Sequence, residues 1–260
     1  MKPAVYQWLA RHRDQEPVRT LHRVAGAIER ACENDSFRSS SNGEDHALRR
    51  CAEFGLHCVF DVGAHIGEWS TAALAAGAST VHAFEIEPAT RSVLLDRFAG
   101  EQRVTVPPVG LASEPGLVKV AIEASNSSVS STVLSPLHPD RTIVECPVTS
   151  GDEYMEKHGI ERIDYLKIDV EGADIEVLRG FLTALESRRI RTIQFEFTLW
   201  AAIARVWLGD FYDLLSPHGY TIGKIYPRRI DWRRYGPEQE RFMRANFLAT
   251  IDAGVVRALR

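Results

Sequence analysis

Short apolar runs alternate with helix-forming stretches along the chain from residue 57 onward. The runs have the length of buried strands, and the stretches between them are rich in alanine or carry apolar residues at helical spacing. Such alternation is typical of βαβ units, in which helices cover a mainly parallel sheet. We therefore predict an α/β fold, with a further β-rich region at 117–148. The predicted strands are 57–61, 79–85, 103–106, 162–169, 190–197, 220–225 and 247–251, and the predicted helices are 68–76, 88–98, 173–185 and 211–215.

The beginning of the chain has a different pattern. Apolar residues recur at helical spacing over 18–32, and a polar break rich in serine and asparagine follows at 34–42. A second short helical run comes after this break. We therefore predict an N-terminal helical extension over residues 1–55, followed by one α/β domain over residues 56–260.

The composition excludes several classes of protein. The 260 residues are 45% hydrophobic and 25% charged, unlike a disordered chain, a collagen or a coiled coil. A net charge of −4 provides no overall attraction to nucleic acid or to an anionic membrane, so we expect no nucleic-acid partner. No run approaches the ~18 apolar residues of a membrane span, and none is predicted. The four cysteines form no CxxC pair and no apolar signal segment opens the chain, so we expect a cytoplasmic protein.

The loop after the first predicted strand carries the first candidate chemistry. It reads DVGAHIG over residues 61–67, and the second strand ends at Glu85, where a carboxylate can accept hydrogen bonds from ribose hydroxyls. A dinucleotide-binding loop would need glycine at His65 and Glu68, because a pyrophosphate must approach bare backbone. S-adenosylmethionine has no phosphate, and its ammonium group suits an acid such as Asp61. The loop therefore predicts S-adenosylmethionine, with a dinucleotide-binding module or an ordinary βα turn as alternatives.

Four motifs in this order resemble the FkbM family of S-adenosylmethionine-dependent methyltransferases. They lie at 60–67, 83–88, 167–172 and 177–180, and the resemblance extends over roughly residues 42–252. It implies the class I methyltransferase fold, a Rossmann-like, mainly parallel sheet of seven strands whose last strand is antiparallel. It also implies an enzyme, since members of the family mostly methylate hydroxyl groups of sugars or of polyketide-type small molecules.

The resemblance further implies roles for single residues. Asp61 and the two loop glycines would line the methionine end of the cofactor, and Glu85 would hold the ribose. The residues after the third strand would lie near the adenine. The chain departs from the family at His65, where asparagine is frequent, and at Ile86, where proline is frequent. The predicted cofactor contacts are Asp61, Gly63, His65, Gly67, Glu85, Ile86, Gly110, Leu111 and Asp169.

Transfer of a methyl group to a hydroxyl requires in-line positioning and, for a weak nucleophile, a general base. The candidate catalytic residues are Asp169, Glu171 and Glu196 at strand ends and His65 in the glycine loop. The three carboxylates could instead hold Mg²⁺ or Ca²⁺, which would lower the pKa of the acceptor hydroxyl. We favour a carboxylate or histidine base and assign no metal ligands, while a divalent metal and positioning alone remain alternatives.

The acceptor cannot be read from the motifs. We favour O-methylation of a sugar, a glycan or a small natural product, with methylation of RNA or of an amine or protein nitrogen as the alternative. A hydroxyl-rich stretch at 125–132 is either a linker or a lid over the site. A stretch rich in arginine and aromatic residues at 226–244 is a solvated loop, an acceptor-binding surface or, as the least favoured alternative, a contact for nucleic acid.

Overall fold

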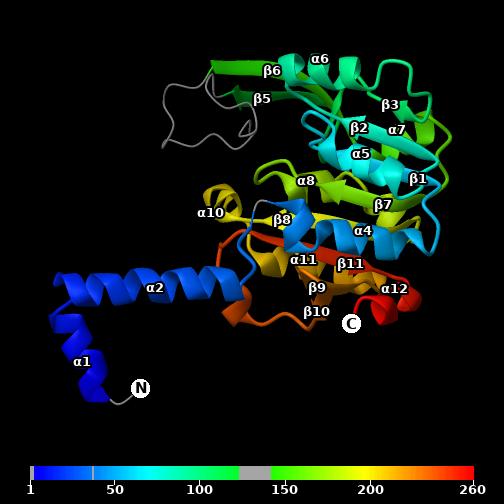
Figure 1. Cartoon of the computed structure of the whole chain (residues 1–260). Coiled ribbons are helices and arrows are strands. Elements are labelled where there is room, and N and C mark those ends of the chain that lie inside the picture. The colour runs from blue at the N-terminus through cyan, green and yellow to red at the C-terminus, as the bar shows by residue number, and fades with distance from the viewer. Residues whose placement is uncertain (1–2, 37, 123–141) are drawn as a thin grey trace.

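The computed structural model describes residues 3–36, 38–122 and 142–260. Eight of the strands in these ranges form one sheet, which helices cover on both faces (Figure 1). Their order across the sheet is β10-β9-β11-β8-β7-β1-β2-β3. The strands are β1 (Cys58–Val62), β2 (Thr80–Phe84), β3 (Val104–Thr105), β7 (Ile163–Ile168), β8 (Ile190–Phe197), β9 (Thr221–Tyr226), β10 (Arg229–Trp232) and β11 (Ala245–Thr250).

The strand directions confirm the predicted fold class. β1 pairs in parallel with β2 and β7, β7 pairs in parallel with β8, and β11 runs antiparallel between β8 and β9. The sheet differs from the prediction by one additional edge strand. β10 is antiparallel to β9, and Pro227 and Arg228 form the two-residue turn between them. This hairpin occupies part of 226–244, where the spacing of apolar residues predicted no strand.

Two apolar cores lie on opposite faces of the sheet, because neighbouring residues of a strand point to opposite sides. Val59 belongs to one core and Phe60 to the other, and both are fully buried. Val59 packs with α4 (Glu44–Ala52), α5 (Glu68–Ala75) and α12 (Ala253–Ala258), and α6 (Pro88–Arg97) covers the same face near β2. The helices of the other face are α7 (Gly151–Lys157), α8 (Asp174–Arg179), α9 (Leu182–Glu186), α10 (Leu199–Ala204) and α11 (Leu208–Leu215). The chain also forms two short 3₁₀ turns, η2 (Ser216–His218) and η3 (Pro237–Gln239).

The single helix predicted over 173–185 is in fact two helices, α8 and α9, which meet at Gly180. The backbone of Gly180 lies so close to Ala112 that a Cβ atom there would be 2.2 Å from the Ala112 carbonyl oxygen. This close approach brings the β4 region, which follows the third strand, against the helices of the second face.

A smaller sheet lies beside the main one. It consists of β4 (Gly110–Leu111), β5 (Gly116–Ile122) and β6 (Thr142–Thr149) in the order β4-β6-β5. β5 and β6 are antiparallel and account for the β-rich region that was predicted. The hydroxyl-rich stretch at 125–132 lies outside the described residues.

The N-terminal helices fall into two groups. α1 (Pro3–Arg11) and α2 (Glu16–Cys32) project from the body of the molecule, and α3 (Ser39–Asn42) leads back to it (Figure 1). α4 lies within the predicted extension and packs on the sheet, with Leu48 and Cys51 buried in the core. None of the helices in the described ranges has both the length and the apolar character needed to cross a membrane.

Candidate functional site

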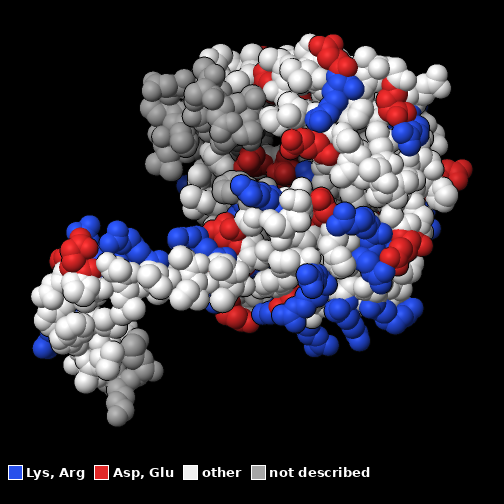
Figure 2. Space-filling view, viewed as in Figure 1, with Lys and Arg blue, Asp and Glu red and all other residues white. Residues whose placement is uncertain are grey.

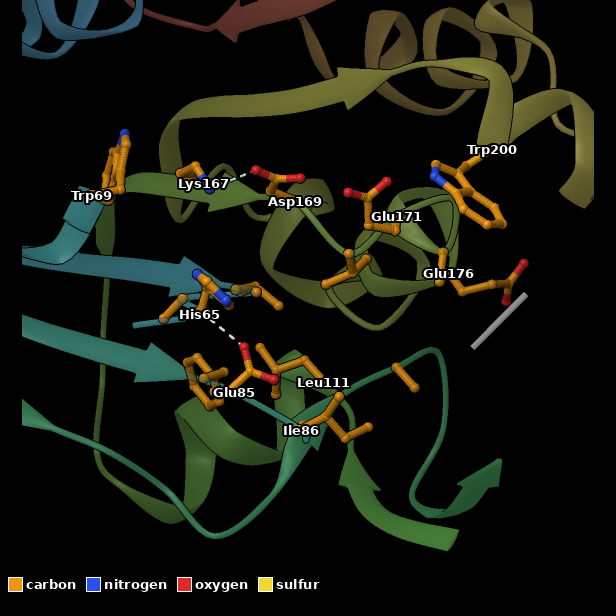
Figure 3. Close-up of a pocket in the computed structure, with 18 of the residues that line it drawn as sticks. His65, Trp69, Glu85, Ile86, Leu111, Lys167, Asp169, Glu171, Glu176 and Trp200 are labelled. Carbon is orange, nitrogen blue, oxygen red and sulfur yellow. Dashed lines mark hydrogen bonds and ion pairs between the residues drawn. The ribbon is translucent and has the colours of Figure 1, made fainter. Parts of the chain in front are cut away.

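A cavity of about 600 Å³ opens where β1, β2 and β7 end, which is the edge where open α/β sheets bind ligands. Its size is that of a site for a small molecule. Figure 2 shows acidic side chains in a hollow of this face, and Figure 3 shows the residues that surround it. The lining comes from the ends of these strands, from the small sheet, and from the N-terminal residues Ser39, Glu44 and Asp45.

The glycine loop is shaped by close contacts within the protein. Gly63 has a φ of +82°, and a Cβ atom there would be 1.8 Å from the carbonyl oxygen of Asp169. Gly67 has a φ of +85°, and its Cβ would be 2.5 Å from the ring of Phe98. Only glycine fits such positions without strain. Gly63 lines the cavity, whereas Gly67 and the buried Asp61 are outside the lining formed by the described residues.

Glu85 is held at the end of β2 by the backbone. Its Oε2 accepts a hydrogen bond from the His65 N–H at 2.9 Å, and its Oε1 accepts one from the Glu87 N–H at 2.8 Å. Burial raises the pKa of Glu85, although these N–H groups oppose the shift. A carboxylate has about four acceptor positions. Glu85 can therefore accept further hydrogen bonds from a ligand in the cavity.

An apolar wall adjoins Glu85. Ile86 packs directly on Gly110, where a Cβ atom would be 2.9 Å from the Ile86 Cδ1. Leu111 lies beside them in the same cavity wall (Figure 3). A flat, weakly polar ring fits a wall of this kind.

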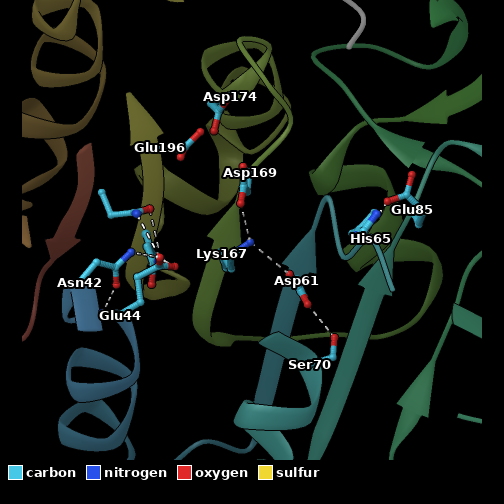
Figure 4. Close-up of polar contacts among 12 residues, drawn as sticks. Asn42, Glu44, Asp61, His65, Ser70, Glu85, Lys167, Asp169, Asp174 and Glu196 are labelled. Atoms are coloured by element: carbon cyan, nitrogen blue, oxygen red, sulfur yellow. Dashed lines mark hydrogen bonds and ion pairs between the residues drawn. The ribbon is translucent and has the colours of Figure 1, made fainter. Parts of the chain in front are cut away.

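A line of charges runs from β1 to the end of β7 (Figure 4). Asp61 is fully buried and accepts a hydrogen bond from the Ser70 Oγ at 2.7 Å. The Lys167 Nζ lies 3.7 Å from Asp61 Oδ1 and 3.1 Å from Asp169 Oδ2. Burial raises the pKa of Asp61, against the influence of Lys167. Burial alone would lower the pKa of Lys167, but the carboxylates of Asp169 and Asp61 outweigh it and raise the pKa above its usual value.

Lys167 is a site residue to which sequence reasoning assigned no role. The signal was nevertheless present, because a lysine in the middle of an apolar strand can be buried only with a partner for its charge.

Three of the four predicted catalytic residues come together. One carboxylate oxygen from each of Asp169, Glu171 and Glu196 lies within 4.8 Å of the others. Glu196 is buried and accepts a hydrogen bond from Arg244 at 2.5 Å. Burial and the nearby charge of Asp169 raise the pKa of Glu196 well above its usual value, although Arg244 opposes them. His65 lies beside Glu85 and apart from this group (Figure 3).

The aromatic residues and arginine of the lining were not predicted individually. Trp69 comes from α5, Trp200 from α10, and Arg244 from the end of the stretch at 226–244. The other arginines of that stretch do not converge on the cavity within the described residues. Arg241 instead pairs with Glu33 at 3.0 Å, close to the end of α2.

Comparison with known proteins identifies the family. The model of the methyltransferase FkbM domain matches residues 61–222, which is more than half of the chain. The chain belongs to the FkbM methyltransferase family. The predicted resemblance to this family is thus confirmed.

A curated relative is similar over part of its length. The hexuronic acid methyltransferase AglP of Haloferax volcanii is 31% identical over 130 residues, which cover 50% of this chain and 52% of the relative. The chain therefore spans about half the length of this relative in the match.

Solved structures with a similar shape include other methyltransferases. An rRNA methylase from Streptococcus thermophilus has a TM-score of 0.43 at 11% identity, with 79% of this chain and 93% of that chain covered. The fibrillarin of Aeropyrum pernix, solved with bound S-adenosylmethionine, has a TM-score of 0.40 at 11% identity, with 75% and 66% covered. Likenesses at these scores add nothing to what the strand order already shows.

Proposed function

We propose that the protein transfers the methyl group of S-adenosylmethionine to a hydroxyl group of a sugar, a glycan or a small natural product. The observation that carries this proposal is the pairing of two unlike walls in one cavity. One wall offers Glu85 beside an apolar surface, and the other offers the carboxylates of Asp169 and Glu171 (Figure 3). The similarity to a protein named for hexuronic acid methylation supports a sugar acceptor.

The cofactor occupies the Glu85 side in this proposal. The free acceptor positions of Glu85 receive the ribose hydroxyls, and the adenine lies on the wall of Ile86, Gly110 and Leu111. The methionine end extends along the loop of Gly63 toward Asp169. Asp61 acts through Lys167, which it orients and which also contacts Asp169.

The acceptor lies on the carboxylate side. Its oxygen attacks the methyl carbon in line with the sulfur, a C–O bond forms, and the C–S bond breaks. Sulfur keeps the bonding electron pair, so the sulfonium becomes the neutral thioether of S-adenosylhomocysteine. The hydroxyl proton passes to a carboxylate, for which Asp169 and Glu171 are the candidates at the cavity wall. Asp169 is the favoured base because Lys167 fixes its position.

A thermal melt tests the cofactor assignment. S-adenosylhomocysteine at about 100 times its Kd should stabilise the protein by about 2.7 kcal/mol, while NAD⁺ should have no effect. Glu85→Ala should remove most of this stabilisation. Glu101→Ala is the matched control, because Glu101 pairs with Arg103 away from the cavity and its loss should leave the ligand effect intact. A shift with NAD⁺ alone would overturn the assignment.

Turnover tests the reaction. Asp169→Asn should abolish methyl transfer to a panel of sugars and sugar acids while the shift with S-adenosylhomocysteine persists. Full activity in this variant would exclude Asp169 as the base. Methyl label found on RNA or on a protein nitrogen, and on no hydroxyl compound, would exclude the proposed acceptor class.

A further inference from the structure

Four carboxyl groups lie together near the ends of β7 and β8. A single general base would require only one of them. Asp169, Glu171 and Glu196 each place one oxygen within 4.8 Å of the others. Mg²⁺ binds its oxygen ligands at about 2.1 Å, so two ligands of one ion are at most about 4.2 Å apart. Small side-chain rotations would bring these three oxygens onto a single ion.

A fourth carboxyl group provides an independent indication that this place can bind a ligand. Asp174 is buried, and its Oδ2 accepts a hydrogen bond from the Gly172 N–H at 3.3 Å. Its Oδ1 is buried as well and has no hydrogen-bond partner among the described residues. In Figure 4 the carboxyl groups of Asp174 and Glu196 point toward one another. A buried acceptor without a partner is costly, so it calls for a ligand that it can bind.

The charges around this group are out of balance. Lys167 contacts both Asp61 and Asp169, and Arg244 contacts Glu196. Within the described residues, these two cations face Asp61 together with the other four carboxyl groups, and Glu44 adds a sixth near Lys167. The excess of negative charge is best relieved by a cation that reaches several carboxylates at once.

We propose that Asp169, Glu171 and Glu196 bind a hard divalent cation, Mg²⁺ or Mn²⁺, with the free oxygen of Asp174 at the back of the site. All the ligand atoms are oxygens, which Mg²⁺ and Mn²⁺ prefer. The site offers neither the nitrogen nor the sulfur ligands that are typical of zinc sites. Few protein ligands suffice, because Mg²⁺ commonly keeps water or substrate oxygens in its remaining positions.

The role of this ion rests on the proposed function. An acceptor hydroxyl bound to the cation would have a lowered pKa. As the C–O bond forms, it would lose its proton to the carboxylate oxygen of Asp169 that does not bind the ion, since each of the three residues offers one oxygen as a ligand. Binding of the ion itself needs no turnover and can be measured independently of the acceptor.

The test is the binding of Mn²⁺, followed by electron paramagnetic resonance in the presence of saturating S-adenosylhomocysteine. The wild-type protein should bind one Mn²⁺ that Mg²⁺ displaces, and Ca²⁺ serves as a third competitor. Glu171→Gln should weaken the affinity by at least about tenfold. Glu176→Gln is the matched control, because Glu176 lines the same cavity but pairs with Arg179. The affinity of this variant for Mn²⁺ should equal that of the wild type.

Two results would overturn the inference: no binding of Mn²⁺ at millimolar concentration, or equal affinity in wild type and Glu171→Gln. Asp174→Asn provides a second variant with the same expectation should Glu171→Gln fold poorly. Every variant is first checked for its thermal shift with S-adenosylhomocysteine. A variant that loses Mn²⁺ binding but keeps this thermal shift has lost the ion site alone. Absence of the shift in the wild type would instead count against the proposed cofactor site.

Discussion

The two walls of the cavity are held by different forces. On one wall, Glu85 is fixed by N–H groups of the backbone, and Ile86 rests on the bare backbone of Gly110. On the other, Asp169 and Glu196 are fixed by the side-chain cations Lys167 and Arg244. The first wall is therefore set by the local course of the chain. The second wall depends on buried charges that must compensate one another away from solvent. Removal of one charged side chain should therefore lower the stability of the second wall more than that of the first.

The largest effect is expected where the two walls touch. Gly63→Ala forces a Cβ atom to within 1.8 Å of the Asp169 carbonyl oxygen, at a φ of +82°. Backbone must move to relieve this clash, and the free energy of unfolding should fall by at least about 4 kcal/mol. Gly77→Ala is the control, since Gly77 also has a positive φ but has no atom within 4 Å of such a Cβ. It should cost about 1–2 kcal/mol. Equal costs in urea denaturation would contradict the tight contact.

Lys167→Met tests the wall that depends on charge. Removal of the ammonium leaves Asp61 buried without its cation, which should cost about 3–5 kcal/mol in urea denaturation. Asp61→Asn added to this variant should recover part of the loss, because the uncompensated charge is then gone. A double variant no more stable than Lys167→Met would show that packing, and not charge, sets the cost.

A histidine beneath the other wall should make stability depend on pH. His82 lies in β2, and burial lowers its pKa from the usual 6.5 to about 4. Between these two values the unfolded chain binds a proton that the folded chain does not. Stability is thus complete above pH 6.5 and falls toward pH 4, by about 2 kcal/mol for this half-buried ring. His82→Asn should show a shallower slope of stability against pH, and parallel curves would refute the assignment.

The smallest effect is expected for an ion pair outside the cavity. Lys224 Nζ lies 2.8 Å from the Glu33 carboxylate near the end of α2, and both side chains are partly exposed. Lys224→Met should cost only about 0.2–1 kcal/mol and less at high salt, because water screens the pair. A cost equal to that of Lys167→Met would remove the distinction between fully buried and partly exposed pairs.

The sequence predicted best what neighbouring residues determine. The alternation of strands and helices, the turn at Gly63, and the acids at Glu85 and Asp169 all follow from short patterns. Parallel strands end at the same edge of a sheet, so acids at their ends were expected to lie near one another.

What the sequence did not predict depends on distant partners. Lys167 interrupts an apolar run, and nothing near it in the sequence reveals that Asp61 compensates its charge. β4 has two residues, too few to show a period, and β10 exists only because it pairs with β9. The contact of Arg244 with Glu196 likewise joins β8 to the residue just before β11, which only the folded sheet brings together.

The pairing of β1 has a consequence for how the chain folds. One neighbour of β1 is β2, close in sequence, but on the other side Val59 pairs with Tyr165, more than 100 positions later. Until β7 has been synthesised, β1 has an open, apolar edge in the centre of the future sheet. Such contacts slow folding and expose a strand to wrong partners. A chain that is cut short before residue 163 should therefore aggregate, and half of this protein is not expected to fold as an independent unit.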